Sequence, residues 1–219
     1  VLTLLLCLYG IIGTFVSERE TQMDMLLLVS PNGGRKTALA KILAATLFLL
    51  LTSLWFSLLD LIGFAASFQT LEGLALPVFA IPNFAEVSVN LSIFQYVLLS
   101  AALKCAGAWV MGMLWLLVSM FWKNALLPFV IDFALCMALT VSGAACAYSN
   151  FFWTKVLNPY SLLTNRVLLG KTEFVNLGGF PVLTWQAAIW FALIAGFLLV
   201  TAIYFLSAEN CHRCVGRAK

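Results

Sequence analysis

Charged residues are scarce in this chain of 219 residues. Asp, Glu, Lys and Arg together make up 10% of it, whereas 63% of the residues are hydrophobic. An ordinary soluble domain has about 25% charged and roughly 45–50% apolar residues, so the composition excludes a soluble globular protein. The net charge is only +3, and this small excess of basic residues does not argue for nucleic acid as a partner.

Histidine is nearly absent as well, since His212 is the only one. No histidine lies in any apolar run, and there is no His-Glu-x-x-His sequence. The sequence therefore does not support an intramembrane metalloprotease or Ser/His hydrolase. Cys211 and Cys214 lie close to His212, but a structural zinc site needs four ligands, so we expect no metal site. The six cysteines indicate no disulfide framework.

Long apolar runs are what the sequence does contain. A helix needs about 20 such residues to cross roughly 30 Å of hydrocarbon. Five runs can be read as spans: 1–16, 38–66, 91–122, 125–148 and 185–207. Lipid offers backbone groups no hydrogen-bond partners, and these runs are too continuous for barrel strands. We therefore predict an all-α polytopic membrane protein, a single transmembrane domain over residues 1–219.

The basic residues predict the topology, because loops on the cytoplasmic side are enriched in Lys and Arg. One side collects eight of them: Arg19, Arg35, Lys36, Lys41, Lys123, Arg213, Arg217 and Lys219. The other side holds three: Lys155, Arg166 and Lys171. We therefore predict a cytoplasmic C-terminus, an external segment at 149–184 and residence in the plasma membrane.

The first apolar run starts at Val1, with no initiator Met and no basic leader ahead of it. We expect that this run is a shortened transmembrane helix rather than a signal peptide, which needs a basic start and a small-residue cleavage site. The five visible spans place the present N-terminus outside, so a full chain with a cytoplasmic N-terminus is expected to have six helices.

The segment 17–31, between the first two runs, is acidic at its start and apolar at its end. Ser17 can cap a helix whose first turn holds Glu18 and Glu20, and Pro31 ends it. The segment is too polar to span the bilayer and too apolar to leave its surface. We predict a short helix along the cytoplasmic face; an ordinary interfacial loop helix has the same pattern.

A longer series of residues runs through this segment into the next span. In order, it comprises Ser17-Glu18-Arg19-Glu20, Leu26-Leu27-Leu28, Ser30-Pro31, Arg35 and Lys41-Ile42-Leu43. The series resembles the membrane permeases of the type-two ABC exporters. The chain departs from that family at Gln22-Met23, where Gly-Thr is more usual, and at Asn32-Gly33-Gly34, which sets Arg35 one residue later. The departures leave the subfamily and the substrate open.

In that family the short cytoplasmic helix is the coupling helix, which docks on a partner ATPase. The resemblance implies coupling roles for Glu18, Arg19, Glu20, Asp24, Leu27, Pro31 and Arg35. It also implies an export subunit in the lipid bilayer that is not itself an enzyme, works with a second copy or a homologous permease, and leaves ATP and Mg to the ATPase.

The chain carries no phosphate-binding loop of its own. Its only Gly-Lys pair, Gly170-Lys171, has Asn165 where that loop needs its first glycine. The hydrolysis of ATP is therefore expected in a separate chain. A non-transporting membrane scaffold or sensor and an intramembrane enzyme remain as alternatives.

Charged residues within the spans are further candidates. Lys41 and Asp60 are 19 residues apart, as are Lys104 and Lys123, and 19 residues extend about 28 Å along a helix. Asp60 and Lys104 are thus expected at a similar outer depth, where an ion pair and separate snorkelling to water both fit.

Asp132 follows Asn124 by 8 residues, which places it roughly 12 Å into the bilayer. Pro128, one turn earlier, is expected to free a carbonyl and bend the helix. Asp132 either lines the inner vestibule of a translocation path or is a protonated or hydrogen-bonded residue at a helix contact. Small residues such as Gly107, Gly112 and Gly143 suit close packing between helices.

Overall fold

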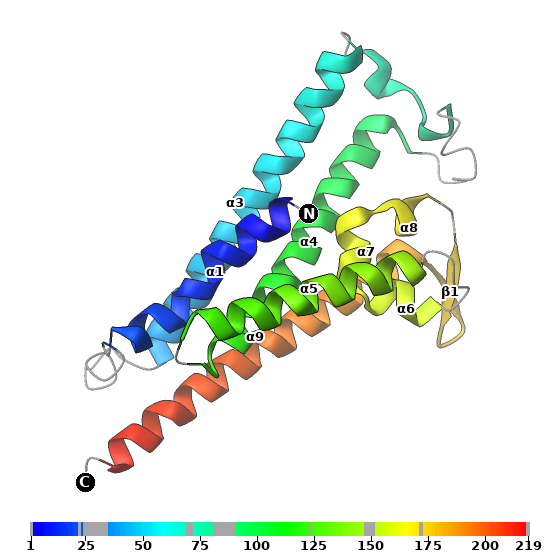
Figure 1. Ribbon diagram of the computed structural model, residues 1–219. Coiled ribbons are helices and arrows are strands. Elements are labelled where there is room, and N and C mark those ends of the chain that lie inside the picture. The colour runs from blue at the N-terminus through cyan, green and yellow to red at the C-terminus, as the bar shows by residue number, and fades with distance from the viewer. Residues whose placement is uncertain are drawn as a thin grey trace. The chain divides into compact units, whose positions relative to one another are not determined.

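The computed structural model describes residues 2–21, 23, 35–68, 72–80, 91–122, 124–146, 152–170 and 173–217. Four of its helices are long and apolar enough to cross a membrane. These are α3 (Arg35–Phe68), α4 (Ile93–Ser119), α5 (Leu126–Cys146) and α9 (Thr184–Arg217) (Figure 1). The predicted class, an all-α polytopic membrane protein, is confirmed.

The first predicted span corresponds to α1 (Leu2–Glu20). Its apolar part, Thr3–Glu18, is shorter than the four long spans. The described residues thus contain four helices of full spanning length and one shorter apolar helix, which correspond to the five apolar runs. At 1.5 Å per residue the whole of α1 extends about 28 Å, close to the thickness of the hydrocarbon core.

The prediction that a separate helix begins at Ser17 is wrong. Helix α1 continues through Glu20 without a break, and the Thr21 N–H still donates to the Ser17 carbonyl at 3.1 Å. Glu and Arg are good helix formers, and no Gly or Pro lies between Gly13 and Glu20 to interrupt the helix. Ser17 therefore lies in the last turn of α1 and caps nothing. Residues 24–34, which hold the rest of the predicted short helix, lie outside the described part of the chain.

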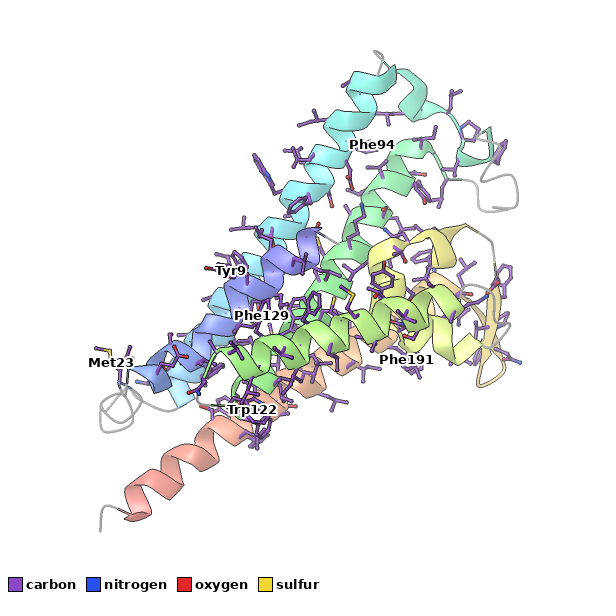
Figure 2. All side chains as sticks on the ribbon, viewed as in Figure 1. Tyr9, Met23, Phe94, Trp122, Phe129 and Phe191 are labelled. Atoms are coloured by element: carbon purple, nitrogen blue, oxygen red, sulfur yellow. The ribbon has the colours of Figure 1, made fainter. Side chains whose placement is uncertain are left out.

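Side chains on the outer faces of the long helices are apolar, as lipid contact requires. Tyr9 on α1, Phe94 on α4 and Phe129 on α5 are exposed aromatic residues (Figure 2). Many exposed Leu residues accompany them, for example Leu47 on α3 and Leu198 on α9. Soluble monomers rarely expose apolar surface on this scale, so these faces fit a bilayer better than water.

The chain divides into two compact units. Unit 1 comprises Val1–Leu50, Trp109–Met137 and Ile194–Lys219, and unit 2 comprises Leu51–Ala108 and Ala138–Leu193. Each of α3, α4, α5 and α9 is divided between the two units, with one segment in each. The fully buried side chains of unit 1 include those of Leu8, Ile11, Leu49, Met111, Met113, Trp115 and Leu116, whereas those of unit 2 include Leu103, Leu162 and Leu168.

Short elements lie in the described parts of the connections of unit 2. They are the 3-10 turns η1 (Glu72–Ala75) and η2 (Val78–Ala80), the helices α6 (Phe152–Leu157), α7 (Pro159–Thr164) and α8 (Arg166–Leu169), and the strands β1 (Phe174–Leu177) and β2 (Phe180–Leu183). The described residues of the predicted external segment 149–184 are therefore largely in helices and strands. Gly178 and Gly179 join the strands with φ angles of 63° and 100°, values that favour glycine.

Two glycines let α7 approach the long helices of unit 2. A Cβ atom at Gly107 on α4 would lie 3.0 Å from Leu162, and one at Gly143 on α5 would lie 2.7 Å from the Tyr160 ring. The sequence favoured a packing role for these small residues, and the structure adds that the partner at both is a short helix of the 149–184 segment rather than another span.

Candidate functional site

The acidic end of α1 is joined to α3 in unit 1. The Glu18 carboxylate forms an ion pair with the ammonium group of Lys41, 23 positions later in the sequence. The same ammonium lies 4.2 Å from the centroid of the Phe15 ring, on the preceding turn of α1. Lys41 thus holds both a charged and an aromatic side chain of α1, so the end of α1 cannot shift relative to the start of α3 without breaking these contacts.

Glu20 joins α1 to α5. Its Oε1 accepts a hydrogen bond from the Ala125 N–H at 2.8 Å, and the Ala125 carbonyl accepts the first backbone bond of α5, from Phe129 N–H at 3.2 Å. A carboxylate at a helix N-terminus is stabilised by about 0.3–1 kcal/mol. The sequence assigned this stabilisation to a new helix starting at Ser17, whereas the structure places it at α5. We call Glu18, Glu20, Lys41 and Ala125 the α1 junction.

The other residues implied in coupling are only partly within the described chain. Arg19 lies in α1 and Arg35 is the first residue of α3, but their side chains lie outside the described part. Asp24, Leu27 and Pro31 lie outside it altogether. Of the residues implied in coupling, Glu18 and Glu20 are therefore the two whose side-chain contacts the structure describes.

Asp132 is completely buried in α5, at 0% exposure. Neither of its carboxylate oxygens has a hydrogen-bond partner within the part of the chain that the structure describes. It lies six residues past the start of α5, about 9 Å along the helix axis. Burial without a partner is costly for a carboxyl group, and such residues within spans are functional candidates for that reason.

Pro128 does not free a carbonyl near Asp132, although the sequence analysis expected it to. Helix α5 begins at Leu126, so Pro128 is its third residue. The N–H groups of a first helical turn have no partner within the helix, and a proline there removes no bond and frees no carbonyl. Asp132 is therefore buried on a regular helix face.

Asp60 and Lys104 meet in unit 2. Lys104 Nζ lies 2.5 Å from Asp60 Oδ2, and the pair is on the surface, with the Asp60 side chain 66% exposed. One residue further along α4, Cys105 Sγ lies 3.0 Å from the hydroxyl oxygen of Ser53 on α3. Of the two arrangements that the sequence left open, the structure contains the ion pair.

Two asparagines that the sequence analysis did not place among the site residues anchor the short helices of unit 2. The Asn158 side chain accepts from Tyr160 N–H at 3.0 Å and donates to the Leu139 carbonyl and to Ser142 Oγ on α5. The pattern Asn-Pro before a helix was a usable signal for this cap.

Asn165 ends α7 in the left-handed region at φ 55°. Its side-chain amide donates to the carbonyl oxygen and the hydroxyl of Ser100 on α4, at 3.0 and 2.6 Å. No local pattern indicates this contact, because its partner is 65 positions away.

Within the described residues, no group of three or more His, Cys, Asp or Glu side chains could hold a metal ion. The side chains of Cys211, His212 and Cys214 lie outside that part. Comparison with protein-family models, with curated proteins and with solved structures found no match. The geometry of the α1 junction and of Asp132 is therefore what any functional interpretation rests on.

Proposed function

We propose that this chain is the membrane-spanning permease subunit of an ATP-binding-cassette exporter, a transport subunit in the plasma membrane with the α1 junction and the C-terminus on the cytoplasmic side. It moves its substrate by alternating access as a dimer with a second permease, either another copy or a homologue. A separate ATPase subunit binds ATP and Mg and supplies the energy.

The observation that carries the proposal is the α1 junction. A coupling segment has to pass a displacement to the spanning helices, and this requires direct links to more than one of them. Glu18 is bonded to Lys41 on α3, and Glu20 is bonded to Ala125 at the start of α5. A force applied by a soluble partner beyond the end of α1 therefore acts on three helices at once.

Asp132 gives the translocation path a candidate residue. Its carboxyl group is buried in α5, the helix whose first residues follow the Ala125 contact. Movement of α5 at the junction alters the surroundings of Asp132, seven residues further along. In the proposed cycle, this movement exposes Asp132 to the inner vestibule.

The first experiment tests the partner. Affinity purification of the full chain from its native membrane is expected to recover a soluble ATPase subunit. A variant with Glu18, Glu20 and Asp24 all replaced by Lys is expected to lose that subunit, because the α1 junction is broken and the charge of Asp24 in the docking segment is reversed. The matched control is Asp60→Lys, which reverses an acid in unit 2 and is expected to retain the ATPase.

A purified chain without any ATPase would overturn the proposal. So would a triple variant that is monodisperse in detergent and still binds the ATPase as the unaltered chain does.

The second experiment tests transmission through the junction. In the complex with its ATPase, trapping by ATP and vanadate is expected to change amide hydrogen exchange at the starts of both α3 and α5. In the variant Glu18→Gln with Glu20→Gln, the change is expected to remain in α1 and to be lost in α3 and α5. Unaltered responses in α3 and α5 would show that the junction does not transmit the displacement.

A further inference from the structure

The β1–β2 hairpin of unit 2 carries exposed apolar side chains on both faces, because the register places Phe174 on one face and Phe180 on the other. From Phe174 to Leu183 the chain has no charged residue. Phe174 is 64% exposed and Phe180 is 75% exposed. An isolated two-stranded hairpin is marginally stable in water, and exposed aromatic rings add to the cost of leaving it there.

The base of this hairpin is fixed to the first residue of a membrane span. Helix α9 starts at Thr184, directly after β2, and its span runs over Thr184–Ser207. The Thr184 N–H and hydroxyl both donate to the Glu173 carbonyl, at 3.1 and 2.7 Å. Glu173 is also bonded to Lys155 through both carboxylate oxygens. The hairpin therefore starts next to the end of the span, at the boundary between the hydrocarbon and the headgroup layer.

Backbone chemistry sets how deep the hairpin can go. A two-stranded sheet has two open edges, and their unpaired N–H and C=O groups cannot be satisfied in hydrocarbon. The headgroup layer contains water for those groups, while aromatic side chains lying there reach the acyl boundary. Trp185, the second residue of α9, is of the residue type that concentrates at the same level.

The free edge of β2 is poorly suited to pairing with a strand of another chain. Thr184 N–H bonds to Glu173, and the register pairs Asn176 with Pro181. Since hydrogen-bonded and non-bonded pairs alternate along an antiparallel ladder, the nitrogen of residue 181 faces away from β1. Proline at this place removes a donor from the open edge. Lipid is therefore a better occupant than a second copy of this chain.

We propose that the β1–β2 hairpin is a membrane-interface anchor, with Phe174 and Phe180 inserted among the lipids of the headgroup layer. The anchor fixes the segment 173–183 to the bilayer beside the start of α9. Because the Glu173–Lys155 ion pair joins the same segment to α6, the position of the short helices α6 and α7 becomes tied to the membrane surface. The proposal does not depend on the transport function.

The test places a photoreactive benzophenone amino acid at Phe180 or at Phe174 of the full chain, reconstituted in nanodiscs of phosphatidylcholine and phosphatidylglycerol. After irradiation, intact-mass spectrometry is expected to show a shift of one phospholipid at both positions. The same probe at Leu198, an exposed residue within the α9 span, is the positive control. Both phenylalanine side chains are mostly exposed, so the probe has room, and a monodisperse elution profile verifies folding.

A covalent dimer formed from either position would overturn the proposal in favour of contact with a second copy. Absence of lipid adducts at Phe174 and Phe180, with adducts at Leu198, would also overturn it, because it would place the hairpin in water.

Discussion

Glu18 on α1 and Lys41 on α3 form an ion pair across 23 positions of sequence, and the Lys41 ammonium also lies over the Phe15 ring. A carboxylate in the last turn of a helix is unfavourable with respect to the helix dipole. Lys41 offsets that cost for Glu18, and the start of α5 does so for Glu20. The acidic end of α1 is thus stabilised by its junction with α3 and α5.

Breaking this pair is expected to weaken unit 1 modestly. Glu18→Gln and Lys41→Gln should each lower the free energy of unfolding by about 1 kcal/mol, since the pair is partly buried. The exchange of both residues, Glu18→Lys with Lys41→Glu, should restore most of the loss. Unfolding in mixed micelles measures this. Phe15→Leu is the control for the aromatic contact, with an expected loss of about 0.5–1 kcal/mol. Equal losses in the exchanged and single variants would contradict the prediction.

The Asp60–Lys104 pair is expected to contribute less. Asp60 is largely exposed and lies three residues before the end of its span, and ion pairs that water reaches are worth about 0–1 kcal/mol. Asp60→Asn and Lys104→Gln should each destabilise unit 2 only slightly, and a double-mutant cycle should give a coupling energy below about 0.5 kcal/mol. A coupling energy of several kcal/mol would contradict this prediction. It would show that lipid or a second copy of the chain shields the pair from water.

Substitutions at Asp132 are expected to affect the stability of the protein and its transport function differently. Asp132→Asn keeps the volume of the side chain, and Asp132→Leu removes a buried polar group that has no partner in the described part of the chain. Asp132→Leu should be as stable as the unaltered protein or up to about 2 kcal/mol more stable.

If Asp132 lines the translocation path, both variants should lose about tenfold in export, the equivalent of about 1.4 kcal/mol. Export by proteoliposomes and ATP hydrolysis by the complex measure the functional side. Two variants that fold, export and hydrolyse ATP at the normal rate would exclude the vestibule role, and a marked loss of stability would instead identify Asp132 as a structural residue.

Gly143 is expected to tolerate no side chain. A Cβ atom there would lie 2.7 Å from Tyr160 Cδ1 and 3.3 Å from Asn158 Nδ2. Gly143→Ala should therefore destabilise unit 2 by about 1–3 kcal/mol, because α7 has to move away from α5. Gly13→Ala is the matched control: it lies within α1 with open space around its Cβ position, and it should be neutral or stabilising by up to about 1 kcal/mol. Equal effects of the two substitutions on thermal unfolding would contradict this packing.

What the sequence could predict depends on how far apart in the chain the interacting residues lie. The apolar runs determined the long helices, because spanning requires length and composition that are visible in any window of about 20 residues. The end of α1 was predicted incorrectly, since a polar cluster after an apolar run indicates a new helix as readily as a continued one. The choice depended on Lys41 and Ala125, which are distant in sequence and stabilise the continued helix.

The sequence by itself determined the class of this protein: an all-α chain whose apolar helices belong in a bilayer. It also placed Asp60 and Lys104 at matching depths, because the rise per residue of a helix is fixed. Only the tertiary structure decided which side chains meet. The partners of Glu18, Glu20 and Asn165 are 23, 105 and 65 positions away, and such contacts arise from the packing of whole helices, which no local pattern of residues encodes.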